Sequence, residues 1–162
     1  MNKLFFTILL CLSILACEKK GNTDNSPQKT NVSAEEAKLV VDKWLMLWET
    51  YDSDMLGDIF LQSEDLTYFS SEKEGLMQGF EQLLPHHAGF GFVAGGKKPE
   101  LSLWLENVET RVYDGSVMVG GVWYFGDKSQ PIDSIPKGPV TFVLVRNKDG
   151  IAKIAHTHFA NY

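Results

Sequence analysis

The sequence contains only two cysteines among its 162 residues, Cys11 and Cys17, and both lie near the amino terminus. Residues 18–162 therefore have no thiol to form a disulfide, attack a substrate or bind zinc. Basic residues are also scarce, because 15 lysines and arginines stand against 21 aspartates and glutamates, for a net charge of −6. They form no cluster, so we expect no binding to nucleic acid and none to anionic lipid through the protein surface.

The sequence lacks an apolar run long enough to span a bilayer, but a shorter run lies at the amino terminus. Residues 4–15 (LFFTILLCLSIL) follow the basic Lys3 and are apolar except for Thr7 and Ser13, a composition typical of the core of a signal peptide. The run ends in Ile14-Leu15-Ala16-Cys17, which resembles the lipobox of bacterial lipoproteins.

This lipobox resemblance implies cleavage before Cys17, so that residues 1–16 are a signal peptide and the Cys17 thiol accepts a diacylglycerol. Two or three acyl chains would hold Cys17 firmly on a membrane. We therefore expect a lipid-anchored protein of the bacterial cell envelope, at the outer membrane or the periplasmic face rather than in the cytoplasm; the leaflet stays open. The alternative is an ordinary signal peptide followed by a cysteine by chance.

The segment after Cys17 differs from the rest of the chain. Residues 18–31 include no large apolar side chain, so they cannot bury enough surface to offset the entropy of ordering. We predict that residues 17–32, which begin with the lipidated Cys17, form a flexible tether. Residues 33–162 are then one domain, long enough for a single hydrophobic core.

Helical patterns dominate the first half of this domain. Ser33 and Glu36 form a capping-box pattern, and apolar residues follow at helical spacing for about five turns, which predicts a long amphipathic helix. Residues 55–61 predict a short second helix. Residues 79–87 predict a third, which Pro85 interrupts.

Strand patterns dominate the second half. Five segments are predicted to be strands: residues 66–70, 101–113, 116–125, 140–146 and 151–159. The second and third are joined by Asp114-Gly115, which suits the positive φ angles of a tight hairpin turn. Gly120-Gly121 lies in mid-strand, where glycine usually marks a bulge or a sharp bend.

This order of elements, three helices with one strand among them and then four long strands, resembles the nuclear transport factor 2-like superfamily and in particular its SnoaL-like branch. The most specific stretch is residues 154–159 (IAHTHF), because many members carry an aliphatic-x-His-x-His pattern on the last strand. Residues 44–48 (WLMLW) and 79–81 (GFE) also match. Such members usually have a large aromatic residue two positions before the aliphatic one, where this chain has Ala152.

The resemblance implies an α+β fold shaped as a cone. A strongly bent antiparallel sheet would wrap around the long amino-terminal helix, with two short helices beside it and an apolar cavity inside. Because members of this superfamily include isomerases, cyclases and non-catalytic binding domains, the fold alone does not determine the chemistry.

Strand alternation selects the candidate site on the last strand. With a period of two, Ile154, His156 and His158 share one face, and if this face lines the cavity both imidazoles can transfer protons there. The resemblance implies an acid or a phenol near the strand after the second helix, where Asp65 and Tyr68 lie. The candidate catalytic residues are therefore His156, His158, Asp65 and Tyr68. The candidate ligand-binding residues are Trp48, Tyr68, Trp123, Ile154, His156 and His158.

Structural roles compete with these assignments. Histidines on a final strand can be satisfied by neighbouring backbone or water, Asp65 can be a turn residue, and Tyr68 can be a core aromatic. The spacing His156-x-His158 also occurs in metal sites, and His86-His87 could add a ligand. We expect His86-His87 to be a solvated helix end, and no carboxylate is placed near either pair, so we predict neither a metal nor a cofactor.

Two classes of function remain open. The first, which we favour, is a non-catalytic domain that binds a small apolar or amphipathic molecule, or a partner protein, at the envelope. The second is a cofactor-independent lyase or isomerase, similar to ketosteroid isomerases or polyketide cyclases, with the candidate histidines and Asp65 as acid and base. Superfamily members commonly pair through the outer face of the sheet, so we expect a homodimer, above all if Val117, Val119 and Trp123 face outward.

Overall fold

The computed structural model describes residues 31–162. The predicted signal peptide, the lipid on Cys17 and most of the predicted tether therefore lie outside the described residues. Among residues 31–162, no helix combines the length and the apolar character needed to cross a bilayer.

The long helix α1 spans Ala34–Thr50 and begins as the capping box predicts. The Glu36 backbone N–H donates to Ser33 Oγ at 3.2 Å, and the Ser33 N–H donates to Glu36 Oε2 at 2.8 Å. Both donors would otherwise lack a partner at the helix end. The apolar face predicted from helical spacing is buried: Ala37, Val40, Val41, Trp44, Leu47 and Trp48.

Two short helices follow, each preceded by a single 3-10 turn. Helix α2 spans Leu56–Ile59, and helix α3 spans Leu83–Gly89. The expectation that Pro85 interrupts the third helix was wrong, because Pro85 lies in the first turn of α3. A proline is tolerated there, since the first turn of a helix has no intrahelical acceptor for its N–H groups.

In the described part of the chain, six strands form one curled sheet in the order β2-β1-β6-β5-β4-β3. Their bounds are β1 Thr67–Ser70, β2 Lys73–Gln78, β3 Ser102–Tyr113, β4 Ser116–Gly126, β5 Lys137–Arg146 and β6 Ala152–Phe159. The pairing is antiparallel except between β1 and β6, so the sheet is mixed rather than wholly antiparallel. Strand β2 was not predicted; only Met77 in it is buried, so it carries almost no apolar alternation.

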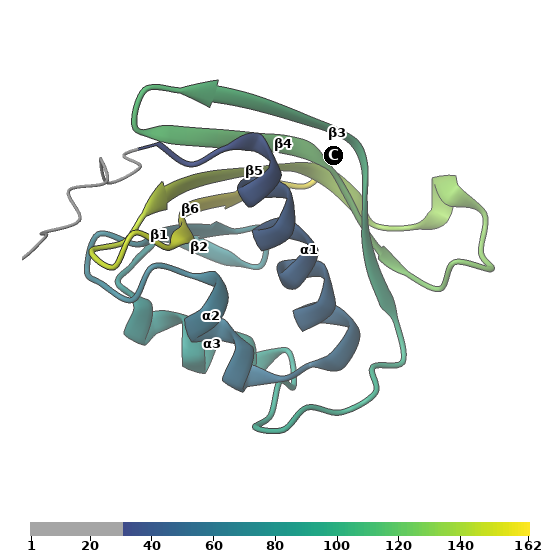
Figure 1. The fold of residues 1–162 in the computed structure, drawn as a ribbon. Coiled ribbons are helices and arrows are strands. Elements are labelled where there is room, and N and C mark those ends of the chain that lie inside the picture. Colours follow the sequence, from purple (N-terminus) through teal and green to yellow (C-terminus); the bar gives the residue numbers. More distant parts are fainter. Residues whose placement is uncertain (1–30) are drawn as a thin grey trace, which may run out of the picture.

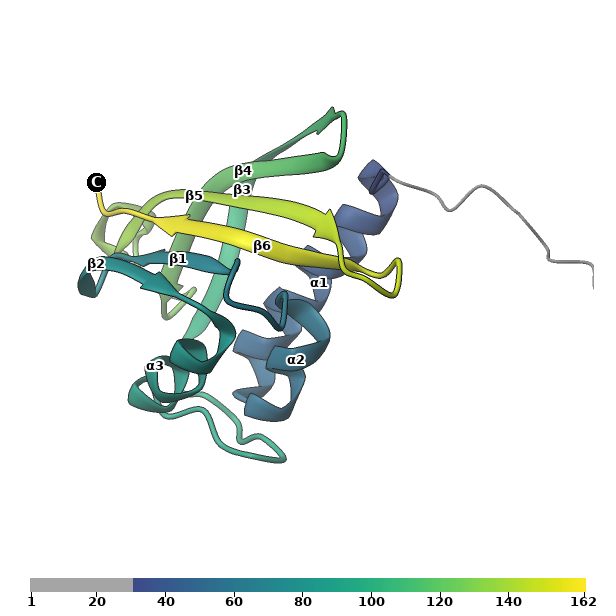
Figure 2. The same cartoon turned by 90° about the vertical axis from the view of Figure 1, so that its left-hand side faces the viewer.

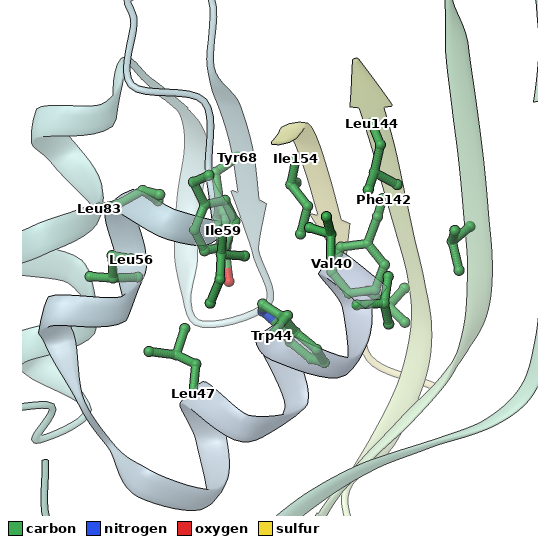
Figure 3. Packing of buried hydrophobic residues seen from close by; sticks show 14 of the residues in the cluster. Val40, Trp44, Leu47, Leu56, Ile59, Tyr68, Leu83, Phe142, Leu144 and Ile154 are labelled. Carbon is green, nitrogen blue, oxygen red and sulfur yellow. The ribbon is translucent and has the colours of Figure 1, made fainter. Parts of the chain in front are cut away.

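Helices α1, α2 and α3 lie on the same side of the sheet, which curls over α1 (Figures 1 and 2). The core fills the space between α1 and the concave face of the sheet, as the packing of Trp44, Phe142 and Ile154 shows (Figure 3). Val117, Val119 and Trp123 belong to this core. The condition that these three side chains face outward, under which they would have supported a homodimer, is therefore not met.

The bend of the sheet is produced partly on β3. Glu106 pairs with Val122 and Glu109 pairs with Gly120, so β3 has one residue more than β4 between these pairs. Asn107 in this bulge has a φ of 52°. Gly120-Gly121 on β4 thus mark a bulge, as predicted, but the extra residue of this bulge is on β3. A Cβ on Gly121 would lie 3.2 Å from the Glu106 carbonyl oxygen, which explains the glycine.

Candidate functional site

A one-residue bulge in β6 determines where its side chains point. Leu144 of β5 pairs with Ile154, but Val143 pairs with His156, so Ala155 is an extra residue on β6. A bulge of this kind breaks the strict alternation of faces. Ile154 and Thr157 are therefore both completely buried, whereas His156 is turned to the opposite face. The expectation that Ile154, His156 and His158 share one face of the last strand was wrong.

His156 and His158 lie on the outer face of the sheet, next to β1. The Nδ1 atom of His156 is 2.8 Å from Thr67 Oγ1. The Phe69 ring lies beside both imidazoles, with centroid distances of 6.3 Å to His156 and 5.4 Å to His158. Burial lowers the pKa of His156, and the neighbouring His158 lowers it further. Neither histidine lines the cavity between the helices and the sheet.

Asp65 and Ile154 are also absent from the cavity wall. Asp65 lies in an exposed turn before β1, where its backbone N–H donates to Ser63 Oγ at 3.2 Å. Ile154 is packed in the core. Neither residue can therefore contact a ligand in this cavity, and Asp65 lies in a turn, the role that competed with the catalytic one.

A cavity of about 540 Å³ opens between the carboxyl-terminal half of α1 and the concave face of the sheet. This volume is within the range of sites that hold small organic molecules. Its wall is largely aromatic and includes Trp48, Phe90, Trp123, Phe125 and Phe159. A cavity lined in this way favours apolar ligands of limited size.

Three of the predicted ligand-binding residues, Trp48, Tyr68 and Trp123, line this cavity. Trp48 packs edge-on against Phe92, with ring centroids 5.0 Å apart. Trp123 donates its indole N–H to the Ala160 carbonyl at 2.9 Å, which ties β4 to the carboxyl terminus. Their rings are therefore held in place by the fold.

Tyr68 reaches from β1 into the core, on the side of α1 (Figure 3). Only 3% of the residue is exposed, and its hydroxyl makes no hydrogen bond within residues 31–162. Burial raises the pKa of Tyr68 far above its ordinary value, because a phenolate would be poorly solvated there. The group is thus a neutral phenol that is available as a hydrogen-bond donor.

His86 and His87 do not form the solvated helix end that we expected. His87 is completely buried, and its Nδ1 lies 2.9 Å from the Leu83 carbonyl, so the Nδ1–H donates to that oxygen. Burial lowers the pKa of His87 to about 4. The rings of both histidines contact Tyr68, with centroids 5.4 Å and 6.1 Å away. Helix α3 therefore places a neutral imidazole behind the cavity wall.

The mouth of the cavity is formed by the β1–β2 turn, the start of β5 and the carboxyl terminus. The Tyr162 N–H donates to the Lys137 carbonyl at 3.1 Å, which lays the last residues along β5. Gly138 permits this arrangement, because a Cβ there would lie 1.9 Å from the Ala160 carbonyl oxygen. Glu72 and Lys137 are the charged residues at this mouth.

The mouth lies at the opposite end of the molecule from the start of the described chain. Lys137, the first residue of β5, lines the cavity, while Arg146, its last residue, donates to the Asn31 carbonyl at 2.9 Å. A ten-residue strand is about 33 Å long. Figure 2 shows the same separation, with the carboxyl terminus at one end and the start of α1 at the other.

The cavity offers little acid-base chemistry. Its ionisable residues are Tyr68, which is neutral, and Glu72, Lys137 and Tyr162 near the mouth. Among residues 31–162, no histidine and no aspartate line it. Within residues 31–162, no three histidine, cysteine, aspartate or glutamate side chains are grouped so that they could hold a metal ion.

Solved structures of other proteins have the same arrangement of helices and curled sheet. A nuclear transport factor 2-like superfamily protein from Salmonella enterica superposes with a TM-score of 0.62 at 17% identity, over 78% of this chain and 89% of that one. The chain has a nuclear transport factor 2-like fold. No protein-family model matches the sequence, and no curated protein matches it either.

Two further similar structures have different names. A protein from Parabacteroides distasonis proposed to be a ketosteroid isomerase gives a TM-score of 0.59 at 18% identity, over 77% of this chain and 86% of that one. The CaMKII hub of S. rosetta gives 0.61 at 17% identity, over 81% and 98%. At this level of identity the likeness extends to the fold alone, so the chemistry has to be argued from the site.

Proposed function

We propose that residues 33–162 are a SnoaL-like domain that binds one small apolar or amphipathic molecule without converting it. The observation that carries this proposal is the aromatic cavity of about 540 Å³, in whose wall the described part of the chain places no histidine or aspartate. Burying an apolar molecule against such a wall is favourable by about 25 cal/mol per Å² of apolar surface. A partner protein is the other occupant that the sequence analysis left open.

The proposal includes the lipid on Cys17. The chain would then be a lipoprotein of the bacterial envelope, with the domain held outside the cytoplasm. The lipobox resemblance of residues 14–17 supports this part.

Tryptophan fluorescence of residues 18–162 tests binding, because Trp48 and Trp123 line the cavity. We expect a saturable change with members of a panel of apolar molecules, and mass spectrometry should recover each ligand unchanged. Trp123→Phe should reduce the change, whereas Trp104→Phe should not, because Trp104 stacks on Tyr124 away from the cavity. No binding across the panel would count against the proposal.

Catalysis is the second candidate, supported by the similarity to a protein proposed to be a ketosteroid isomerase. The acid-base set of His156, His158 and Asp65 would not reach a ligand in the cavity, since none of them lines it. A catalytic mechanism would have to use Tyr68 with the charged residues of the mouth. A ligand recovered as a different compound would establish this second function.

We also propose a homodimer. The outer face of the sheet carries the exposed Phe69 and the half-buried Met118, Val122 and Val143, an apolar surface that a second copy could cover. Sedimentation of residues 18–162 at tens of micromolar should give the mass of a dimer. A monomer at that concentration would contradict this part of the proposal.

A further inference from the structure

Aromatic rings from separate segments of the described chain surround the cavity. Inside the mouth, the lining aromatic residues are Trp48 on α1, Tyr68 on β1, Phe90 just after α3, Trp123 and Phe125 on β4, and Phe159 on β6. The rings of Phe90 and Phe125 contact Trp48, with centroids 5.7 Å and 5.9 Å away. The other three rings are joined through Phe159, at 5.9 Å and 6.2 Å. The wall therefore consists of two continuous groups of rings.

The two tryptophans present ring carbon to the cavity rather than their N–H groups. The Trp123 N–H donates to the Ala160 carbonyl, and Nε1 of Trp48 is fully buried, out of reach of a ligand. The face of an aromatic ring carries partial negative charge, which attracts cations and repels anions. A wall of this kind has no net charge but favours positive charge beside it.

The charged side chains at the mouth add to this preference. The Lys137 Nζ lies 3.7 Å from Asp133 Oδ1 and 5.6 Å from the centre of the Tyr124 ring, and both of these residues lie outside the cavity wall. The positive charge of Lys137 is thus held by groups other than a ligand. The carboxylate of Glu72, in contrast, makes no ion pair with any residue of the described chain.

This setting discriminates between ligand head groups. An anionic head would lose its hydration without meeting a free cation, which is unfavourable. An uncharged apolar molecule would gain from burial alone. A methylated ammonium would gain from burial of its methyl groups and from attraction to the rings, an arrangement that proteins use to recognise such groups. The excess of acidic residues, 21 against 15 basic ones, also attracts cations to the domain.

We propose that the cavity binds an amphipathic organic cation, with a methylated ammonium group held against the aromatic rings and near the Glu72 carboxylate. This inference rests on the proposed binding function and names the chemical class of its ligand.

Three probes with the same benzyl body test the charge preference. They are benzyltrimethylammonium, neopentylbenzene, in which a carbon replaces the nitrogen, and the anion benzylsulfonate. Calorimetry with residues 18–162 should show the ammonium compound binding about tenfold more tightly than neopentylbenzene, the difference expected for a cation among desolvated rings. Benzylsulfonate should bind most weakly of the three.

A ring variant tests the contribution of the wall. In Phe90→Leu an aliphatic side chain replaces one ring, so the preference for benzyltrimethylammonium over neopentylbenzene should fall several-fold while neopentylbenzene still binds. Phe80→Leu is the matched control, because Phe80 is half-buried outside the cavity wall, and it should keep the preference.

A charge variant tests the contribution of the mouth. Glu72→Gln should weaken binding of benzyltrimethylammonium several-fold and leave neopentylbenzene unchanged, and added salt should reduce the difference between Glu72→Gln and the unmodified protein. Glu74→Gln is the matched control, because it removes the same charge from an exposed position on β2 that does not line the cavity.

The outcomes distinguish the two proposals. Equal or weaker binding of benzyltrimethylammonium than of neopentylbenzene would overturn the cation preference and leave the binding function standing. An unchanged preference in both Phe90→Leu and Glu72→Gln would also overturn it. Failure of the three probes and of the whole fluorescence panel to bind would overturn the binding function and the cation preference together.

Discussion

Complete burial of the His87 side chain links the stability of the domain to pH. Burial lowers the pKa of His87 from 6.5 to about 4, so between these values the unfolded chain binds a proton that the folded chain does not. The stabilisation is therefore fully present above pH 6.5 and is lost as pH falls toward 4. Burial lowers the pKa values of His86 and His156 as well, and their effect has the same sign.

We predict that the free energy of unfolding falls by up to about 3 kcal/mol from pH 7 to pH 4 through His87 alone. Urea denaturation at several pH values measures this. His87→Phe should make the pH dependence shallower, because the variant has no imidazole to protonate at this position. The same slope in the variant and the unmodified protein would show that His87 contributes nothing to it.

The two histidines of the last strand should not affect ligand binding. His156 and His158 are on the outer face of the sheet, so His156→Gln and His158→Gln should each leave the affinity for a ligand found in the fluorescence panel within about twofold of the unmodified value. Trp123→Phe is the comparison, since its ring lines the cavity. A tenfold loss in either histidine variant would place these side chains in the site after all.

At the scale of the element, the start of β5 holds the mouth of the cavity in shape. Gly138 lets the last residues of the chain lie against β5, where Ala160 N–H donates to the Pro139 carbonyl at 3.2 Å. We predict that Gly138→Ala displaces this segment and lowers the melting temperature by several degrees, as strain of a few kcal/mol would. Thermal unfolding followed by circular dichroism measures the shift.

Gly89→Ala is the matched control for this substitution. No atom lies within 4 Å of a Cβ added at Gly89, so this variant should keep its melting temperature within about a degree. If Gly138→Ala had the melting temperature of the unmodified protein, the carboxyl-terminal segment would have to move away from β5 without a loss of stability. In that case Trp123, which donates to the Ala160 carbonyl, should show altered fluorescence.

At the scale of the whole molecule, the positions of the mouth and of Asn31 determine how a lipid-anchored chain would present its cavity. They lie at opposite ends of β5, about 33 Å apart. If residues 18–31 form the predicted tether, a flexible chain of that length would span about 20 Å on average, less than this separation. The mouth should therefore face the aqueous phase, and ligands should come from there rather than directly from the supporting membrane.

Single cysteines introduced into the lipidated protein measure this orientation, because residues 18–162 have no cysteine of their own. A fluorophore on Glu72→Cys, at the mouth, should be quenched little by lipid-borne quenchers in vesicles. The same fluorophore on Lys148→Cys, in the turn after β5, should be quenched more strongly than on Glu72→Cys. Equal quenching at both sites would contradict the orientation, and Cys17→Ser should release the protein from vesicles altogether.

Features encoded by neighbouring residues could be predicted from the sequence. The capping box of Ser33 and Glu36, the helical spacing up to Trp48 and the turn at Asp114-Gly115 each depend on a few adjacent positions, and α1 and the β3–β4 hairpin form as expected. The overall fold could also be predicted, because the order of helices and strands along the chain resembles that of the nuclear transport factor 2-like superfamily. Trp48, Tyr68 and Trp123, which were predicted to bind a ligand, line the cavity, and their role in binding stays a prediction.

Features that depend on distant partners could not be predicted. The bulge at Ala155 exists because β6 pairs with β5 and with β1, the latter about 90 residues earlier, and it turns His156 and His158 away from the cavity. His87 is buried because α3 packs beneath β1 and α1, although its local sequence is that of a helix end. Local patterns thus specify most of the elements that form, although not β2, which has almost no apolar alternation. The face that each side chain occupies depends on pairing and packing between segments far apart in the chain, where a shift of one residue reverses the side to which it points.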